Sequence, residues 1–397
     1  MGQHAGPPTS ADLNCRGITY IASNVSERIH AIGEELATGK YDLVALQEVW
    51  VEALYEQLVS QVEDVLPYHH YFYSGWNGSG VCVFSKHPIV DVYQYRFTLN
   101  GHAHKLLHAD WYGGKLVGLC RIQYAGTEIN FYASHTHAEY NPDNDEYKAH
   151  RVSQAFELSQ FIRHMSQSAD VNILAGDLNN QPFELGLKII QSNTGMEDAW
   201  PSAEHKNADD SGMTCWCSEN NYNSGCPEAP MRIDYVFYKG SARCRVKCVH
   251  CETTMHKVPG KPFNYSDHEG VLAHLELEKV SEPSDDNPGD TEHLPDIPLR
   301  DDNLREAVTI MDEAIISTAS VRWFYAAVLF LSVLLLLLPS SLSLPILLTS
   351  LTNLLAAFGM LWSFWMGAVV TETERRGLLA TRSSMQVLLA GSVKKRN

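Results

Sequence analysis

The segment from Trp323 to Val370 contains no charged residue, and this feature constrains the chain more than any other. A helix that crosses a lipid bilayer needs about 20 consecutive, mainly apolar residues. The segment provides two such lengths, 323–339 and 345–369, on either side of a short polar turn. A buried helix of a soluble domain does not need so long an uncharged run. Residues 323–370 are therefore predicted to form two transmembrane helices.

Basic residues follow the second of these helices. Two helices joined by a tight turn have their outer ends on one side of a membrane, and lysine and arginine favour the cytosolic side. The segment 371–397 contains Arg375, Arg376, Arg382, Lys394, Lys395 and Arg396. We therefore expect a multi-pass membrane protein with a basic cytosolic tail. Both termini and the N-terminal domain would face the cytosol, in the endoplasmic reticulum, the nuclear envelope or the plasma membrane.

The residues before the apolar segment divide into a linker and a helix. The stretch 281–302 is rich in acidic residues and proline, which predicts a solvated linker. Asn303 could cap a helix over 303–322 whose apolar face carries Leu304, Val308, Met311 and Ile315. This amphipathic pattern favours a lead-in helix at the membrane interface and, equally, an ordinary helix packed on the preceding domain.

Residues 11–280 alternate between strand and helix patterns, whereas residues 1–10 are predicted to be disordered. Apolar faces at helical spacing predict helices that start at Ser26 and Glu146. Short apolar runs predict strands at 41–46, 81–84, 116–119 and 271–277. Many strands with few interleaved helices indicate an α/β fold of two packed sheets covered by helices. The formal net charge of −17 argues against a nucleic-acid-binding protein, because such proteins neutralise phosphates with lysine and arginine.

Five apolar runs in this domain end at a polar side chain that can bind a metal or transfer a proton. They lead to Glu48, to His135, to Asp177 with Asn179, to Asp234, and to Asp267 with His268. A short apolar run is typical of a buried strand, and a polar group at its end lies where a substrate can reach it. The set as a whole predicts a catalytic site, although each member alone is weak evidence.

Oxygen-bearing side chains in this set predict a magnesium site. Mg²⁺ prefers a few hard oxygen ligands and keeps several water molecules. Glu48 and Asn14 could provide these ligands, with Asp267 as a further oxygen, and Mn²⁺ could replace Mg²⁺. Taken alone, Glu48 is more typical of a solvated loop residue.

The other members predict the attack of water on a phosphate. Asp177 could align the water or a leaving group while the amide of Asn179 donates to a phosphoryl oxygen; the alternative is an Asx-turn that closes the strand. His268 could act as general base if Asp234 holds its other ring nitrogen. His135 would then be a cationic donor to the developing phosphoryl charge. Most of the 18 histidines are nevertheless expected to be ordinary surface or core residues.

The order of these motifs resembles the DNase-I-like family of metal-dependent phosphodiesterases. The motifs that carry this resemblance are Asn14, 46–48, 176–179, 232–235 and 266–268. Closer agreement with the neutral sphingomyelinases that end in two membrane helices appears in 79–89, 108–111, 114–119 and 135–141. The resemblance covers most of the chain from residue 12 to about 370.

This resemblance implies a four-layer α/β sandwich that hydrolyses sphingomyelin to ceramide and phosphocholine with Mg²⁺. When the family's roles are carried over by position, Glu48 and Asn14 would hold the metal. Asp177 and Asn179 would position the water and the phosphate. His135 would support the phosphoryl group, and His268 would be the base with Asp234 behind it. In some relatives an Asp and a Lys exchange partners to move a catalytic residue. Asp110 and Lys115 match those positions, and a surface salt bridge is the alternative interpretation.

The N-terminus departs from the family pattern. Pro7 and Pro8 stand where the family has an apolar strand, and Arg16 stands where it has tryptophan. Because two prolines cannot serve a central ladder, we expect a truncated or alternative N-terminus in which the usual strand before Asn14 is missing. The alternative functions are a lyso-choline-phospholipid or phosphoinositide phosphohydrolase of the same fold, and an inactive membrane adaptor.

Overall fold

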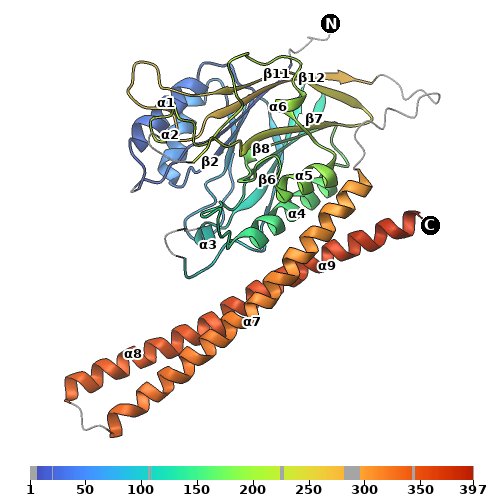
Figure 1. Ribbon diagram of the computed structural model, residues 1–397. Coiled ribbons are helices and arrows are strands. Elements are labelled where there is room, and N and C mark those ends of the chain that lie inside the picture. Colours follow the sequence, from blue (N-terminus) through green and yellow to red (C-terminus); the bar gives the residue numbers. More distant parts are fainter. Residues whose placement is uncertain are drawn as a thin grey trace. The chain divides into compact units, whose positions relative to one another are not determined.

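The computed structural model describes residues 7–19, 21–105, 108, 110–223, 228–280, 296–341 and 345–396 (Figure 1). The chain divides into two units, Met1–Arg300 and Asp301–Asn397. The first unit contains two six-stranded sheets. The second consists of long helices.

The first sheet has β1 near its centre. Its order is β11 (Cys244–Thr254), β12 (Gly270–Lys279), β1 (Thr9–Asn14), β2 (Leu43–Gln47), β4 (Cys82–Ser85) and β3 (Tyr68–Tyr71). The strand β1 runs antiparallel to β12 and parallel to β2. Every residue of β1 and β2 is buried, as expected for strands that lie inside a layered fold.

The second sheet carries the longer strands. Its order is β5 (Ile89–Arg96), β6 (Leu116–Tyr124), β7 (Thr127–His135), β8 (Val171–Asp177), β10 (Asp234–Gly240) and β9 (Glu197–Asp198). The strands β7 and β8 are parallel, whereas β8 and β10 are antiparallel. These pairings place the end of β7, the end of β8 and the start of β10 at one edge of the sheet.

Helices cover the outer faces of both sheets, while an apolar core fills the space between them. The inner core includes Leu43, Val83, Phe131 and Ile173. Apolar residues of α1 (Val25–Leu36) and α2 (Glu52–Val62) pack on the first sheet, and those of α4 (Lys148–Met165) and α5 (Leu185–Thr194) on the second. Figure 1 shows this order of layers, to which α3 (Asp110–Gly113) and α6 (Ala199–Ser202) are short additions. The predicted four-layer α/β sandwich is confirmed.

The expectation of a missing first strand is wrong. Thr9 and Ser10, placed in the disordered 1–10 segment by the sequence prediction, are the first residues of β1. Pro8 lies immediately before the strand, where a missing N–H removes no ladder bond. Its carbonyl accepts a hydrogen bond from the Leu275 N–H at 3.0 Å. Residues 1–6 lie outside the described part of the chain.

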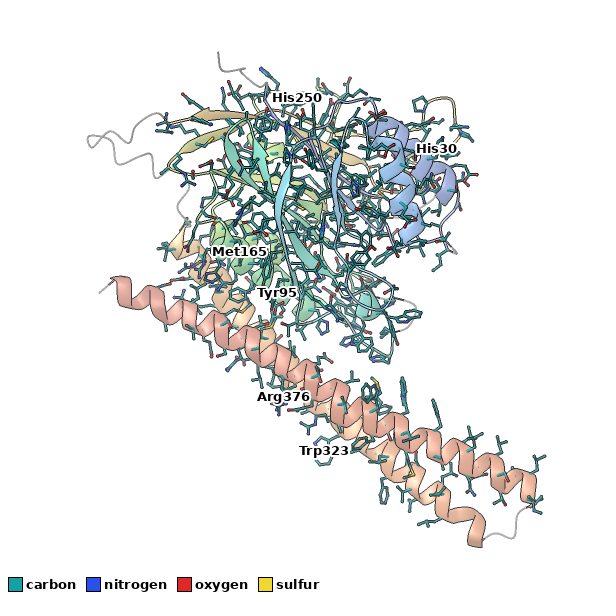
Figure 2. All side chains as sticks on the ribbon, turned by 180° about the vertical axis from the view of Figure 1, so that it is seen from behind. His30, Tyr95, Met165, His250, Trp323 and Arg376 are labelled. Atoms are coloured by element: carbon teal, nitrogen blue, oxygen red, sulfur yellow. The ribbon has the colours of Figure 1, made fainter. Side chains whose placement is uncertain are left out.

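The second unit is an antiparallel hairpin of helices. It comprises α7 (Ile297–Ser341), α8 (Ile346–Phe364), the π-helical turn η1 (Trp365–Val370) and α9 (Thr371–Arg396). Two segments, Ile297–Leu337 and Ile346–Ser392, are long and apolar enough to cross a membrane. Trp323, with 77% of its surface exposed, is one of many apolar side chains on the outside of this hairpin (Figure 2). These helices indicate a membrane protein.

Close contacts set the register of the hairpin. A Cβ at Gly359 would lie 2.5 Å from Ser332 Oγ, so α7 and α8 approach closely there. At the charged end, Arg322 Nη1 lies 3.1 Å from Glu372 Oε2. This ion pair joins the residues that flank the uncharged segment. The start of the first half and the end of the second half are therefore at the same level, and the two halves are antiparallel.

The helix boundaries differ from those expected. Helix α7 begins at Ile297, so Asn303 lies inside the helix and does not cap it. Pro298 is in the first turn, where backbone N–H groups have no intrahelical partner and proline is tolerated. Residues 281–295 of the expected linker lie outside the described part. The expected basic tail is the helix α9 as far as Arg396.

Candidate active site

The expected polar residues meet at one edge of the sandwich. In the second sheet, His135 pairs with Asp177 across β7 and β8, and Asp177 pairs with Asp234 across β8 and β10. In the first sheet, Asn14 ends β1, and Glu48 follows the end of β2. Because the carboxyl ends of parallel strands share an edge, each sheet contributes its part of the site.

Asn14 joins the two sheets. Its Nδ2 donates to Asp177 Oδ2 at 2.9 Å and to Glu48 Oε1 at 3.2 Å. Its Oδ1 accepts the backbone N–H of Arg16 at 3.0 Å. Asn14 is almost fully buried, and the strand β1 that carries it is formed. Asn14 therefore ends a regular strand, contrary to the expectation that the strand before it is missing.

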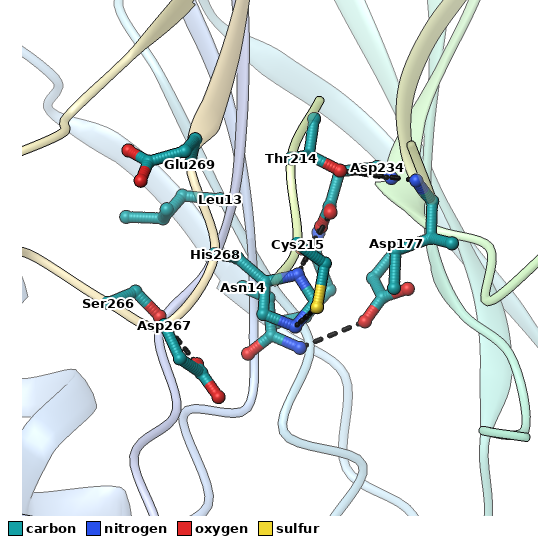
Figure 3. Close-up of polar contacts among 12 residues, drawn as sticks. Leu13, Asn14, Asp177, Thr214, Cys215, Asp234, Ser266, Asp267, His268 and Glu269 are labelled. Atoms are coloured by element: carbon teal, nitrogen blue, oxygen red, sulfur yellow. Dashed lines mark hydrogen bonds and ion pairs between the residues drawn. The ribbon is translucent and has the colours of Figure 1, made fainter. Parts of the chain in front are cut away.

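His268 and Asp234 form a buried pair (Figure 3). His268 Nδ1 lies 2.9 Å from Asp234 Oδ2 and 3.1 Å from Oδ1. The backbone N–H of Asp234 donates to Thr214 Oγ1 at 3.2 Å, which fixes the start of β10. Burial lowers the pKa of His268, but the charge of Asp234 outweighs it, so this pKa lies well above its usual value.

Asp177 is a buried carboxylate with raised proton affinity. Burial, and then the charge of Asp234, raise its pKa to about 7. Its Oδ1 accepts the backbone N–H of Asn179 at 3.0 Å, so the Asx-turn considered as an alternative is present. This turn gives Asn179 a φ of 44°, and its side-chain amide donates to the Thr136 carbonyl at 3.0 Å.

His135 is held by a buried lysine. Lys115 Nζ donates to His135 Nε2 at 2.7 Å and to the Thr136 carbonyl at 2.8 Å. Burial, followed by the charge of Lys115, lowers the pKa of His135 well below its usual value. Because Lys115 donates to Nε2, the ring proton lies on Nδ1, and the low pKa disfavours the expected cationic form. Within the described residues, Nδ1 has no hydrogen-bond partner.

Asp110 and Lys115 form an ion pair inside the protein and not on its surface. Lys115 Nζ lies 3.1 Å from Asp110 Oδ1, and the two side chains are 2% and 7% exposed. Burial raises the pKa of Asp110, but Lys115 and His137 lower it by a larger amount. The pKa of Asp110 therefore lies below its usual value. Tyr140 donates to Asp110 Oδ2 at 2.6 Å. The charged form of Asp110 is therefore favoured, and Lys115 links this ion pair to His135.

Glu48 and Asp267 occupy the outer part of the site. Burial, followed by the charge of Asp267, raises the pKa of Glu48. Glu48 has a φ of 57°, a left-handed conformation that turns the chain out of β2. Asp267 accepts from Ser266 Oγ at 3.2 Å and forms an ion pair with Arg16 at 3.3 Å. Asp267 is thus at the rim, whereas Asp177 and Asp234 are deep.

Comparison with known proteins decides the family. A model of the endonuclease/exonuclease/phosphatase family matches residues 13–268, which include Asn14 and His268. A putative neutral sphingomyelinase of Drosophila melanogaster is 36% identical over 95% of this chain and 96% of that protein. The chain belongs to the neutral sphingomyelinases of this family.

Other relatives agree with this membership. A putative neutral sphingomyelinase of Caenorhabditis elegans is 43% identical over 63% of this chain and 61% of that protein. Sphingomyelin phosphodiesterase 2 of Homo sapiens is 40% identical over 70% of this chain and 66% of that protein. The match thus spans slightly less than two thirds of these two relatives. Enzymes of this kind are phosphodiester hydrolases.

A solved structure agrees with the fold. A variant of the beta toxin of Staphylococcus aureus, with bound magnesium ions, has a TM-score of 0.52. Its sequence is 19% identical, and the match covers 68% of this chain and 99% of that one. The likeness supports the sandwich architecture of this sphingomyelinase-family chain.

The donor set fits a hard divalent cation. Asp177, Asp234 and His268 have ligand atoms within 4.8 Å of one another, which makes a possible metal site. Burial is the main cause of the raised pKa values of Asp177 and Glu48, and the neighbouring carboxylates Asp234 and Asp267 raise them further. A cation would relieve this repulsion. Glu48, Asn14 and Asp267, the expected ligands, lie outside that group of three, and Asn14 joins Glu48 to Asp177.

Sequence reasoning missed one member of the carboxylate cluster of this sphingomyelinase-family site. Asp12 in β1 is fully buried, and its Oδ1 accepts from Gln47 Nε2 at 2.7 Å. Burial, and then the charge of Asp234, raise the pKa of Asp12 well above its usual value. The signal for it was the strand periodicity, because residues two apart in a strand share a face and Asn14 was already a candidate.

Proposed function

We propose that the chain hydrolyses sphingomyelin to ceramide and phosphocholine in a magnesium-dependent reaction at the cytosolic face of a membrane. One observation carries the proposal: the buried Asp234–His268 pair adjoins Asp177 and Asn14 in a chain of the neutral sphingomyelinase group. This arrangement supplies a base and a phosphate-facing polar edge. Nothing comparable is needed by a membrane adaptor.

His268 is the general base of the proposed reaction. Asp234 holds Nδ1, while Nε2, which lies 3.7 Å from Cys215 Sγ, would take a proton from the attacking water. The water oxygen forms a bond to phosphorus, and the bond from phosphorus to the ceramide oxygen breaks. The imidazolium that forms is stabilised by the Asp234 carboxylate. The leaving ceramide oxygen takes a proton from solvent and the imidazolium returns its proton to solvent, so ceramide and phosphocholine are released and His268 is restored.

The other residues hold the phosphate. Asp177 and Asn179 position the water and a phosphoryl oxygen, since the Asx-turn fixes the Asp177 side chain and the Thr136 carbonyl holds that of Asn179. The neutral His135 donates from Nδ1 to the phosphoryl group while Lys115 holds Nε2. The Asp110–Lys115 pair keeps that lysine in place, which is the role we assign to the predicted switch pair.

Magnesium would be held by Glu48 with Asn14, and Asp267 would add a further oxygen. When bound, Mg²⁺ or Mn²⁺ polarises the phosphate and offsets the charge that develops on it. The chain's own contribution is to orient the Glu48 carboxylate through the hydrogen bond from Asn14. The oxygen donors match the preference of magnesium.

The helical hairpin supports a lipid substrate. An enzyme anchored in a bilayer meets lipid head groups at a high effective concentration. The basic residues of α9 follow the second apolar segment, which favours a cytosolic position for that end of the hairpin. The catalytic unit precedes α7 and would lie on the same side.

The test is phosphocholine release from detergent-dispersed sphingomyelin by the purified full-length chain. Release is expected with Mg²⁺, is expected to stop with EDTA, and is expected to be lost in His268→Ala. His164→Ala, which changes an exposed histidine near the end of α4, is the matched control and should retain activity.

A substrate panel tests the choice of lipid. We expect sphingomyelin to be cleaved faster than a lyso-choline phospholipid or a phosphoinositide. Faster cleavage of either alternative would reassign the substrate. Full turnover by His268→Ala would remove the assignment of the base, and turnover in EDTA would remove the role of the metal.

A further inference from the structure

Arg16 has no part in the proposed reaction, yet it reaches the metal side of the site. Arg16 Nη1 lies 3.3 Å from Asp267 Oδ2, and the two side chains are 33% and 23% exposed. The backbone N–H of Arg16 donates to Asn14 Oδ1 at 3.0 Å. Arg16 therefore contacts two of the three residues to which the metal is assigned.

The surrounding backbone directs Arg16 toward this contact. Arg16 has a φ of 45°, in the left-handed region that residues other than glycine rarely adopt. Its carbonyl accepts from Nη2 of the fully buried Arg28 at 2.8 Å, which holds this conformation. The Arg16 guanidinium also lies 5.6 Å from the centre of the Tyr222 ring. These contacts therefore hold the Arg16 side chain in a defined position.

The two oxygens of the Asp267 carboxylate have different partners. Oδ1 accepts from Ser266 Oγ at 3.2 Å, and Oδ2 lies 3.3 Å from Arg16 Nη1. A carboxylate oxygen is also the kind of ligand that a hard divalent cation prefers. In the structure the guanidinium of Arg16 is a cation on Asp267. A divalent ion that binds Asp267 has to displace this guanidinium or share the carboxylate with it.

We propose that Arg16 competes with the divalent cation for Asp267 and thereby weakens Mg²⁺ binding. The inference rests on the proposed function, in which Glu48, Asn14 and Asp267 hold the ion. Because partly exposed ion pairs are weak, the competition is expected to change Kd about two- to fivefold. A tryptophan at this position would have no charge and could not compete. This chain should therefore need more Mg²⁺ than an otherwise equal enzyme with tryptophan at residue 16.

The experiment is calorimetric titration of Mg²⁺ into the purified, EDTA-treated full-length chain in detergent. Arg16→Gln is expected to lower Kd about two- to fivefold, and Arg16→Lys to leave it near the wild-type value. Asp267→Asn should raise Kd. In the Asp267→Asn background, Arg16→Gln should give less than half of its effect in the wild type, because the competed carboxylate is gone.

A matched control separates the local pair from a change in overall charge. Arg243→Gln removes an exposed ion pair with Asp170, at the opposite end of β8 from Asp177, and should leave Kd unchanged. The Mg²⁺-induced rise in Tm, measured for each variant, gives a second readout of binding that does not depend on activity.

Two results would overturn the competition. One is an Arg16→Gln chain that binds Mg²⁺ no more tightly than the wild type. The other is that Arg16→Gln lowers Kd by the same factor in the wild type and in the Asp267→Asn background. In either case the proposed function stands if the wild type binds Mg²⁺ and hydrolyses sphingomyelin. A wild type that hydrolyses the lipid without binding Mg²⁺ would instead overturn the metal assignment and this inference together. If Arg16→Gln does not fold, the comparison of Arg16→Lys with Arg16→Trp decides.

Discussion

Replacement of Asp234 by asparagine addresses the base assignment most directly. The substitution keeps the shape of the side chain but removes its charge. The Asp234 side chain is fully buried and that of His268 is 10% exposed, so water cannot replace the lost partner. Burial already lowers the pKa of His268, and the charge of Asp234 is what raises it. Asp234→Asn should therefore lower the pKa of His268.

The size of the effect follows from the contact. A buried hydrogen bond to a charged group, here at 2.9 Å, contributes about 1.5–3 kcal/mol. If this energy stabilises the imidazolium in the transition state, kcat falls about 10- to 150-fold. The fall approaches about 10⁴-fold if the asparagine amide also imposes the wrong imidazole tautomer.

The assay is the pH dependence of phosphocholine release at saturating Mg²⁺. Because the base must be unprotonated, kcat/KM falls on the acidic side of its pKa. Asp234→Asn should move this acidic limb to lower pH while kcat drops, and Asp170→Asn, a carboxylate at the far end of β8, should change neither. If Asp234→Asn lowers the rate equally at every pH and leaves the acidic limb of the profile in place, the reasoning is refuted.

Three further perturbations follow from the structure. Burial and Asp234 raise the pKa of Asp177 from 3.8 to about 7, so its contribution to stability is present below about pH 4 and is lost as the pH rises to about 7. Asp177→Asn should flatten the fall of Tm over this range in EDTA, and an unchanged slope would contradict this. Lys115→Met leaves Asp110 buried without its cation and should lower the free energy of unfolding by about 3–5 kcal/mol in denaturant titrations, whereas a loss below about 1 kcal/mol would contradict it. Gly359→Leu should force α7 and α8 apart at Ser332 and lower the Tm of the hairpin in detergent, while Gly391→Leu, with nothing within 4 Å of its Cβ, should not.

The sequence predicted the sandwich because its buried strands are short apolar runs with clear ends. Leu43–Gln47 and Val171–Asp177 contain little else, so both their extent and the polar residues after them were visible. The strand Thr9–Asn14 was missed because its face toward the second sheet is polar, with Ser10, Asp12 and Asn14. Apolar periodicity cannot detect a strand whose inner face belongs to a catalytic site.

The charge states of the site could not be predicted from the sequence. Burial and the charge of Lys115, twenty residues earlier in the chain, hold the pKa of His135 well below its usual value. The start of α7 was also misjudged, since Pro298 is disruptive within a helix but is tolerated in the first turn. Both errors arise from context: a residue type fixes which chemistry is available, while its neighbours in space fix which one is used.

The two halves of the site are joined by one buried arginine as well as by Asn14. Arg28 Nη1 donates to the Cys15 carbonyl and to the Tyr265 carbonyl at 2.6 and 3.2 Å. One of these carbonyls follows Asn14 directly, and the other lies three residues before His268. A guanidinium presents its donors in a rigid plane, so Arg28 fixes the spacing of these two loops, while Asn14 fixes that of the two sheets. Asn14 and His268, which are far apart in the sequence, can thus keep one geometry, although no strand contains both.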